Sequence, residues 1–447
     1  MDLLNERIRK IFPRYLFASF GSALIVSVYS LVDMIMVGQY EGPLGSSALA
    51  VVMPIFNIVN SLGLLFGIGG AVLMSVARGK GEEKQGNACF TVALIGCAVL
   101  TAVIWILMLT LTEPLLRLFG GRGETLELAK KYAFFIALAV PSFMMGQFLS
   151  AVVRNDDNPT LATAAVLAGG AFNVFGDWFF VFFCDMGIAG AGMATAIGQT
   201  IALLILIAHF FTARRKVAFA RPARFFRRTG EIVSAGLASF ATDFSVGVLC
   251  MLFNNRVMQL FGEDALAVYG VLINVAFLVQ ALAYGVGQAA QPILSVNYGA
   301  GNAQRVQNTL LAGVSVAAAL GAVSLLVTEL APVPIVRLFM TTTPEVEAIA
   351  PEIVRLYSIA FLFLPYNIFS LYYFQSVMRS TLSWILSFVR GIALSALLLF
   401  LLPAAAGADA LWLAMPLTEI LIFGAVTFLI VRFSRGAVKT VKAEMPN

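Results

Sequence analysis

The sequence contains few charged residues for its length. Asp, Glu, Lys and Arg together make up 12% of its 447 residues, whereas apolar residues make up 60%. With a mean hydropathy of +0.91, this composition excludes a water-soluble globular protein, which needs a largely polar surface. A membrane-spanning helix needs roughly 20 apolar residues. The chain therefore has room for about twelve spans and for no sizeable soluble domain.

Histidine and cysteine are also scarce, which excludes most enzymatic and metal chemistry. The single histidine, His209, closes an apolar run beside a basic segment, and we expect it at the membrane interface. The cysteines show no metal-ligand spacing and are expected to be small buried apolar side chains; they are Cys89, Cys97, Cys184 and Cys250. The sequence contains no His/Glu zinc set, Ser/Lys pair or GxxxxGK[ST] phosphate loop. We therefore expect neither an enzyme nor an ATP-driven pump, and no cofactor.

Apolar runs separated by short polar breaks predict twelve transmembrane helices. We place them at 13–38, 50–78, 87–112, 126–152, 158–184, 188–212, 230–260, 264–298, 306–329, 347–376, 381–403 and 408–433. Residues 213–229, which are basic and include Pro222, predict a cytoplasmic linker. This linker would separate an N-terminal lobe (1–212) from a C-terminal lobe (230–447) that ends in a short cytoplasmic tail.

The two predicted lobes share short motifs at a constant offset of about 220 residues. Ser-Phe occurs at 19 and 239, Ala-Leu-Ala-Val at 48 and 265, Ser-Val-x-x-Gly-x-Gly at 75 and 295, and Pro-[Leu/Ile]-[Leu/Val]-Arg-Leu-Phe at 114 and 334. Four matches in the same order indicate a duplicated unit. Because each unit holds an even number of helices, the repeats run parallel. We predict an all-α polytopic membrane protein with two pseudo-symmetric six-helix lobes around a central cleft.

Positive charge is concentrated in the breaks on one side of these helices. The residues concerned are Arg7, Arg9, Lys10, Arg14, Arg78, Lys80, Lys84, Arg214, Arg215, Lys216, Arg221, Arg224, Arg227, Arg228, Arg432, Arg435, Lys439 and Lys442. Loops rich in Lys and Arg remain in the cytoplasm, so both termini are predicted to be cytoplasmic. The net charge of +5 thus reflects membrane orientation, and we expect no nucleic-acid partner.

Among the acids inside predicted spans, we single out Asp33, Asp177, Asp243 and Glu419 as candidates for a functional role. A charge near the bilayer centre costs roughly 2.5–3.5 kcal/mol, so such residues face protein or water and usually have a function. Other acids, including Asp156 and Asp157, fall in loops and are expected to be solvated.

Two of these carboxylates lie in the N-terminal lobe with other oxygen ligands. Asn173 and Asp177 are four residues apart and share one helix face, and Thr195 follows on the next helix. Together with Asp33 they offer hard oxygen ligands for Na⁺, or carboxylates for a proton. A structural hydrogen-bond network is the alternative. At the repeat offset, Asp33 maps to Phe253 or Asn254 and Asp177 to the apolar stretch near Leu402.

The remaining two carboxylates lie in the C-terminal lobe. We assign Asp243 and Glu419, with Gln280 and Gln288, to substrate binding. Arg390 is an alternative partner that would neutralise one of these acids. The 37 phenylalanines and 16 methionines are mostly core or lipid-facing, but those in the cleft would suit lipophilic cations.

Several segments resemble the bacterial MATE (multidrug and toxic compound extrusion) transporters of the MOP flippase superfamily. They are Leu31-Val-Asp33-Met-Ile-Met-Val-Gly38, Arg154-Asn-Asp-Asp-Asn158-Pro159, Asn173-Val-Phe-Gly-Asp177, Gly187-Ile-Ala-Gly-Ala-Gly-Met-Ala-Thr195 and Gln291-Pro292-Ile-Leu-Ser-Val-Asn297-Tyr298-Gly299-Ala300. The resemblance covers nearly the whole chain, and the last segment is its most specific part.

The resemblance implies a monomeric antiporter in the bacterial inner membrane that exchanges organic cations for Na⁺ or H⁺. It assigns the cation site to Asp33, Asn173, Asp177 and Thr195, the residues reached above from their chemistry. Some relatives carry an acid in the tenth helix, but here 347–376 has none after Glu352, which argues against a second cation site.

A lipid-linked saccharide flippase is the rival function within the same superfamily. It would be expected to offer a cationic cleft to a pyrophosphate group, and only Arg256 and Arg390 support that reading.

Overall fold

The computed structural model describes residues 3–212, 215–221, 224–339 and 342–443, and these residues form helices and turns without any β-strand. Arg214 and Pro222 of the predicted linker lie outside the described residues, as do the side chains of Arg435, Lys439 and Lys442. In chain order the elements are α1 (Ile8–Gly79), α2 (Glu83–Leu118), α3 (Gly123–Leu138), α4 (Val140–Asn155), α5 (Pro159–Gly176), η1 (Asp177–Phe183), α6 (Ile188–Ala208), η2 (His209–Phe211), α7 (Phe225–Phe261), α8 (Glu263–Gly299), α9 (Ala303–Leu330), α10 (Pro332–Phe339), α11 (Pro344–Ser376), α12 (Ser380–Phe388), η3 (Val389–Ala393), α13 (Leu394–Ala406), η4 (Ala408–Leu413) and α14 (Ala414–Ala443).

These elements form the twelve spans predicted from the sequence. Ten described segments are long and apolar enough to cross a membrane, and the bent pair α3 and α4 supplies another. The first half of α1 is the remaining span, because α1 is broken at Gly42, which has a φ of 67°. The spans predicted at 13–38 and 50–78 implied a longer connection, which is wrong. Helix α1 continues through this segment and reverses at Gly42, since glycine adopts a positive φ without steric cost.

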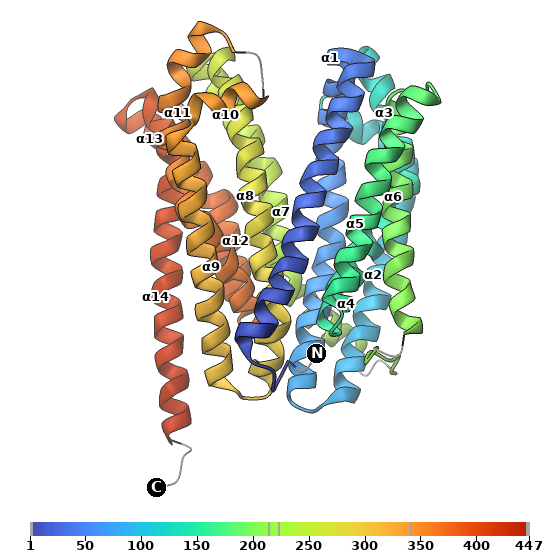
Figure 1. Ribbon diagram of the computed structural model, residues 1–447, viewed down its shortest axis with the longest axis vertical. Helices are drawn as coiled ribbons and strands as arrows, with labels where there is room; N and C mark the ends of the chain where they lie inside the picture. Colours follow the sequence, from blue (N-terminus) through green and yellow to red (C-terminus); the bar gives the residue numbers. More distant parts are fainter. Residues whose placement is uncertain (1–2, 213–214, 222–223, 340–341, 444–447) are drawn as a thin grey trace.

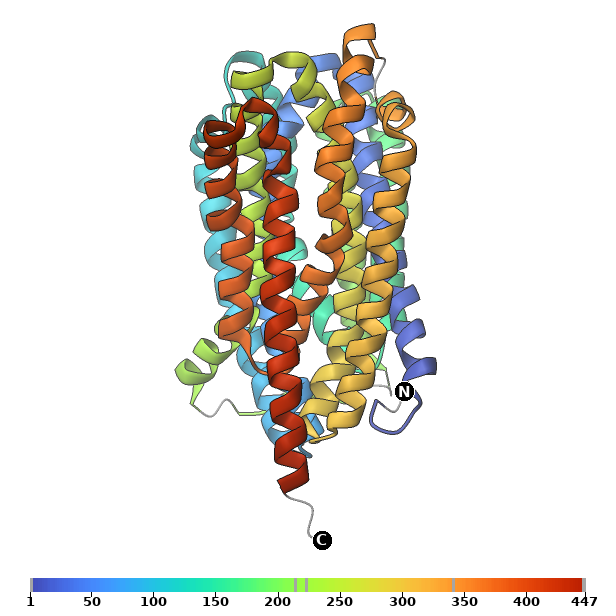
Figure 2. The same ribbon diagram turned by 90° about the vertical axis from the view of Figure 1, so that its left-hand side faces the viewer.

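The helices gather in two groups, α1–α6 and α7–α14, which lie beside each other along the long axis (Figures 1 and 2). The start of α1 and the end of α14 lie toward the same end of the molecule. Because α7 already begins at Phe225, the last five residues of the predicted linker are helical. The short helix α10 was not predicted.

The start of α1 packs against helices of the C-terminal group. Ile11 and Tyr15 are fully buried in one apolar cluster with Ile293 and Phe374. Arg305 of α9 donates hydrogen bonds to the backbone carbonyl oxygens of Leu3 (3.0 Å) and Glu6 (2.8 Å). Figure 1 shows the dark blue end of α1 leaning toward α8 and α9. The first helix is therefore bound to both groups.

Glycines allow the two groups to touch backbone to backbone at this end. A β-carbon added at Gly236 of α7 would lie 1.8 Å from the carbonyl oxygen of Leu65 in α1. A β-carbon at Gly79 of α1 would lie 2.0 Å from the carbonyl oxygen of Val296 in α8. No larger residue fits at such a crossing, as in other closely packed membrane helices. The glycine Gly299, at the repeat offset from Gly79, makes the matching contact with Val76.

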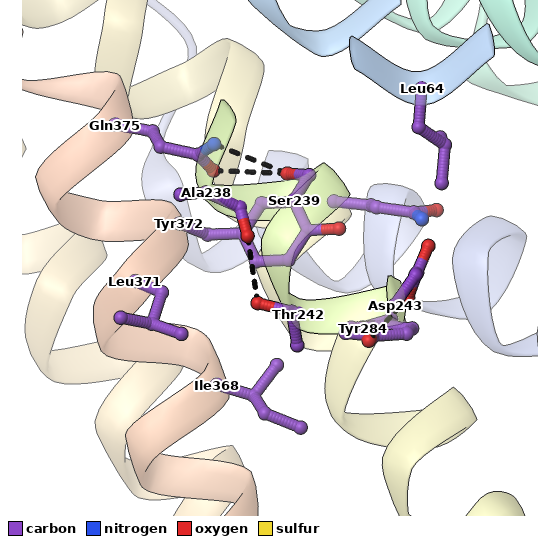
Figure 3. Close-up of a pocket in the computed structure, with 11 residues that line it drawn as sticks. Leu64, Ala238, Ser239, Thr242, Asp243, Tyr284, Ile368, Leu371, Tyr372 and Gln375 are labelled. Atoms are coloured by element: carbon purple, nitrogen blue, oxygen red, sulfur yellow. Dashed lines mark hydrogen bonds between the residues drawn. The ribbon is translucent and has the colours of Figure 1, made fainter. Parts of the chain in front are cut away.

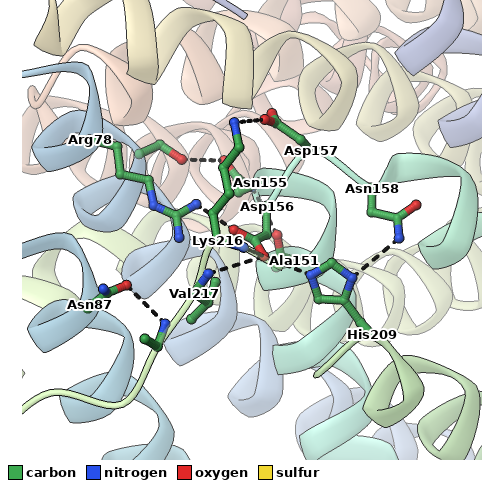
Figure 4. A network of polar contacts seen from close by, with 12 residues as sticks. Arg78, Asn87, Ala151, Asn155, Asp156, Asp157, Asn158, His209, Lys216 and Val217 are labelled. Carbon is green, nitrogen blue, oxygen red and sulfur yellow. Dashed lines mark hydrogen bonds and ion pairs between the residues drawn. The ribbon is translucent and has the colours of Figure 1, made fainter. Parts of the chain in front are cut away.

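A buried carboxylate, Asp156, holds the segment after α6 against the loop between α4 and α5 (Figure 4). Arg78 Nη1 donates to Asp156 Oδ1 at 2.6 Å, and His209 Nε2 donates to Oδ2 at 2.7 Å. The backbone N–H groups of Lys216 and Val217 donate to the same Oδ2 (3.0 and 3.4 Å).

The neutral tautomer of His209 suits this network. Asn158 Oδ1 accepts from the Leu161 backbone N–H, so its amide nitrogen faces His209 Nδ1 at 3.3 Å. Nδ1 is then an acceptor, and the ring proton lies on Nε2, toward Asp156.

The sequence-based expectation for Asp156 was wrong. Asp156 was expected to be a solvated loop charge, yet its side chain is fully buried, as is that of His209 at the end of α6. Proximity in sequence could not reveal this, because Arg78 and the Lys216 amide reach Asp156 from distant segments. Burial by itself would raise the pKa of Asp156, but the His209 hydrogen bond, the Arg78 charge and the Lys216 amide outweigh it and hold the pKa below its usual value.

We expect Gly236→Ala to destabilise the protein, because the added methyl group would force α1 and α7 apart. Overpacking of this kind costs about 1–3 kcal/mol, which should lower the Tm measured by scanning fluorimetry in detergent. Gly247→Ala on the same helix is the matched control, because its β-carbon would have no atom within 4 Å. Equal Tm values for the two variants would contradict the close crossing.

Replacing Asp156 by Asn should reduce the free energy of unfolding by about 3 kcal/mol at neutral pH, because Arg78 loses the buried carboxylate with which it pairs. Since the folded-state pKa of Asp156 is depressed, its contribution is complete above the unfolded value of about 3.9 and fades as the pH falls below that value. Wild type and variant should therefore converge in acid when unfolding is followed by denaturant titration. A difference that grew on acidification would show that Asp156 is not held ionised.

Candidate cation and substrate sites

The four residues predicted to bind a cation meet inside the N-terminal lobe. Asp33 lies on α1, Asn173 near the end of α5, Asp177 at the start of η1 and Thr195 on α6. Asn173 Nδ2 donates to Thr195 Oγ1 at 2.9 Å, and the carboxylates of Asp33 and Asp177 lie close enough to interact electrostatically. All four side chains are buried, with 6% of Asp33 and none of Asp177 exposed.

Small residues bring the helices of this site together. A β-carbon at Gly169 of α5 would lie 2.5 Å from the Gly198 carbonyl oxygen on α6, and one at Gly176 would lie 2.8 Å from the β-carbon of Ala194. The α5–α6 spacing is therefore set by backbone contact, which places Asn173 opposite Thr195. At Asp177 the α-helix changes into the π-helix η1. Such π-helical turns often occur at functional sites.

The polar atoms left without partners at this site are all oxygen acceptors. They are Asp33 Oδ1, Asn173 Oδ1 and both carboxylate oxygens of Asp177. Neither aspartate forms an ion pair with any basic residue that the structure describes. Two negative charges without counterions are costly in a buried place, so the arrangement favours a bound cation or proton. Within the described residues, no group of three or more His, Cys, Asp or Glu side chains could hold a metal ion.

One further residue of this site was not found from the sequence. The hydroxyl group of Tyr132 on α3 donates to Asp33 Oδ2 at 2.9 Å and also faces Thr195. Tyr132 stands in an apolar run with no spacing that relates it to Asp33, so only the packing of α3 against α1 reveals it.

A narrow pocket lies where α7, α8 and α11 face α1 (Figure 3). It contains the predicted substrate residues Asp243 and Gln288, and most of its wall comes from the C-terminal group. The other lining residues are Leu64, Ala238, Ser239, Thr242, Tyr284, Ile368, Leu371, Tyr372 and Gln375. The pocket thus combines one carboxylate with tyrosine rings and aliphatic side chains.

Asp243 is the only carboxylate in the lining of this pocket. Its Oδ1 accepts a hydrogen bond of 2.6 Å from the Tyr284 hydroxyl group, which accepts one of 2.7 Å from Gln280 Nε2. Gln280 therefore supports Asp243 through Tyr284 and itself lines a second cavity. The sequence offered no signal for Tyr284 or Tyr372 beyond their aromatic character.

The fourth predicted substrate residue, Glu419, has other partners. It is fully buried, and its Oε1 lies 2.6 Å from Arg390 Nη2 while Asn367 donates to its Oε2 at 2.7 Å. Glu419 does not line the pocket of Asp243. The sequence analysis had also considered that Arg390 neutralises one of the acids, and Arg390 forms this ion pair with Glu419. We therefore leave Glu419 out of the substrate site.

The fold and sequence of the chain match known transporters. The MatE family model matches residues 18–179 and again from 238 to 401, where the internal repeat places the second unit. The multidrug export protein MepA of Staphylococcus saprophyticus is 25% identical over 282 residues, and the alignment covers 62% of each chain. MepA of Staphylococcus haemolyticus is 24% identical over 339 residues, with 75% of this chain and 74% of the relative covered.

Solved structures show the same fold. An outward-facing structure of a multidrug resistance MATE family transporter of the MOP superfamily superposes with a TM-score of 0.90, at 19% identity and 98% coverage of both chains. A MOP superfamily transporter from Pyrococcus furiosus gives a TM-score of 0.90 at 20% identity, again over 98% of both chains. The chain belongs to the MatE family of multi-pass membrane transporters and is not an enzyme.

Proposed function

We propose that this protein is an antiporter that exports lipophilic, mostly cationic organic compounds in exchange for Na⁺ or H⁺. The observation that carries the proposal is the set of unpaired oxygen atoms around two buried aspartates, Asp33 and Asp177. The names of the MepA relatives, multidrug export proteins, support the substrate class. No other cofactor is needed.

The pocket supports a site for organic cations. The partly exposed Asp243 would pair with an ammonium group, and the rings of Tyr284 and Tyr372 offer faces for cation–π contacts.

Transport would proceed by alternating access between the two lobes. Here the lobes touch closely at the end that holds Gly79 and Gly236, which we assign to the cytoplasmic side from the positive charge of the nearby loops. A cation arriving at Asp33 and Asp177 would favour one lobe arrangement, and drug binding the other. We expect a monomer in the bacterial inner membrane with both termini in the cytoplasm.

The driving force follows from charge conservation. Exchange of one monovalent cation for another moves no net charge, so the membrane potential would not contribute. A tenfold ion gradient supplies about 1.4 kcal/mol, enough for about tenfold exclusion of the drug.

The flippase alternative finds little support in the geometry. A pyrophosphate group requires free cationic side chains, but Arg390 is paired with Glu419. Arg256 donates to Gln259 and lies over the Phe400 ring, outside the pocket of Asp243.

Asp177→Asn should abolish cation-coupled efflux while the protein stays folded, because it removes one of the two buried charges that attract the cation. The measurement is efflux of a fluorescent organic cation from proteoliposomes, with pH and Na⁺ gradients imposed separately. Asp409→Asn, at an exposed position, is the matched control. Gradient-driven export by Asp177→Asn at the wild-type rate would remove the site assignment.

Asp243→Asn should weaken binding of organic cations about tenfold or more, because a charge-assisted contact is lost. Binding of a neutral analogue of the same shape should not change. Both affinities can be measured by titration calorimetry on the purified protein. An equal loss for the two compounds would indicate a change of pocket shape and would contradict the role of the charge.

A further inference from the structure

Three phenylalanine side chains near the inter-lobe linker are largely exposed. Phe211 at the end of η2 is 86% exposed, Phe219 in the linker 72% and Phe226 near the start of α7 89%. Exposed apolar residues in the middle of a span face the lipid chains, but these three stand among basic residues where the spans end. Aromatic rings mixed with Arg and Lys are typical of segments that lie in the membrane interface.

One apolar cluster at the start of α2 brings these exposed rings together. Phe90 of α2 contacts both Phe210 of η2 and Phe219, with ring centroids 5.9 Å apart in each pair. Phe225 of α7 packs against the same cluster, and its ring centroid lies 5.6 Å from that of Phe226. The end of η2, the linker and the start of α7 therefore form one continuous surface around Phe90.

Hydrogen bonds hold this surface against the N-terminal lobe. The backbone N–H of Ala218 donates to Asn87 Oδ1 of α2 at 3.1 Å, beside the Asp156 network (Figure 4). Arg228 Nη1 of α7 donates to the backbone carbonyl oxygen of Gln85 at 3.4 Å. Because the segments on both sides of the linker are bonded to α2, the exposed rings are presented on a fixed support.

The same surface carries positive charge that the described residues do not neutralise. Residues 213–229 contain seven basic residues and no acid. Arg215, Arg221 and Arg224 are exposed and form no ion pair with any acid that the structure describes. Asp157 is already paired with Lys216. An anionic partner therefore complements the charge of this surface.

The length of α7 places its start beside the lipid headgroups. The helix has 37 residues, whereas a span needs roughly 20. Its first turns carry Arg227 and Arg228, which are costly inside the hydrocarbon, so the extra length belongs at this end. Figure 2 shows the yellow-green start of α7 standing out from one side of the bundle, near the end where both chain termini lie.

We propose that this surface docks on anionic phospholipid headgroups of the leaflet at this end of the protein. We call it the linker patch, and it consists of Phe211, Arg215, Phe219, Arg221, Arg224 and Phe226. The rings would enter the boundary between headgroups and acyl chains, while the guanidinium groups would pair with lipid phosphates. A soluble phosphate would satisfy only the charges, whereas an anionic lipid also covers the exposed rings. This partner is independent of the transported compound.

The test compares the binding of two lipids to the full-length protein. Native mass spectrometry of the detergent-solubilised protein gives dissociation constants for added phosphatidylglycerol, which is anionic, and for phosphatidylcholine, which has no net charge. We expect the wild type to bind phosphatidylglycerol about tenfold more tightly. In Arg215→Gln/Arg221→Gln/Arg224→Gln the affinity for phosphatidylglycerol should fall about tenfold to hundredfold and that for phosphatidylcholine should stay within about twofold, because each basic residue near a membrane surface contributes about fivefold.

The matched control removes the same charge from another place at the same end. Arg7→Gln/Arg9→Gln/Lys10→Gln neutralises three exposed residues around the start of α1 and should change phosphatidylglycerol affinity less than about twofold. Equal losses in the two triple variants would show that only the total charge matters, and would overturn the inference. Because all the replaced side chains are exposed, the Tm should not change. If the linker triple variant does not fold, Arg221→Gln alone should still weaken phosphatidylglycerol about threefold to fivefold.

Two further measurements identify the lipid as the occupant. Phe219→Ser/Phe226→Ser keeps every charge and should weaken both lipids by the same factor, about threefold to tenfold, because the rings contact the acyl chains of either lipid. Inorganic phosphate at millimolar concentration should not displace phosphatidylglycerol from the wild type. Displacement by phosphate, or an unchanged lipid affinity in the phenylalanine variant, would indicate a site for soluble anions and would contradict a lipid surface.

Discussion

Hydrogen-bond partners are the constraint on which this structure depends, because a helix bundle in a membrane has little water to satisfy a buried polar atom. Most buried polar side chains here find a partner. Glu419 meets Arg390 and Asn367, and Asp156 meets Arg78 and His209. The few atoms left unpaired therefore stand out. Those at Asp33 and Asp177 are acceptors, and the ligand we propose for them is a cation or a proton.

The sequence predicted the spans well because span length and apolar character are local properties. It also predicted that Asn173, Asp177 and Thr195 lie together. Asn173 and Asp177 are about one helix turn apart, and a short connection leads to the helix that carries Thr195. Asp33 was assigned to the same site from its chemistry alone, because a buried acid in an apolar span is costly and usually has a function. Each of these residues could be recognised from its own stretch of sequence, without knowledge of contacts between distant segments.

The residues that the sequence did not reveal depend on contacts between distant segments. Nothing in the sequence distinguishes Tyr132 and Tyr284 from other aromatic residues. Only the structure shows that their hydroxyl groups donate to Asp33 and Asp243. Arg154 stands beside two acids in the sequence, and that proximity suggests a local ion pair that does not form. Glu419 depends on distant contacts in the same way: an acid inside a span suggested a substrate ligand, whereas the structure pairs its carboxylate with Arg390 and Asn367.

The first helix has a consequence for any motion between the lobes. Its start is bonded to α8 and α9, while Asp33, about five turns further along, belongs to the opposite lobe. The lobes consequently cannot separate at this end as two rigid blocks. Either the anchor at Leu3 and Glu6 is released or the segment between Tyr15 and Asp33 bends. The backbone of α1 thus links Asp33 in the N-terminal lobe directly to the contacts that Leu3 and Glu6 make with the C-terminal group.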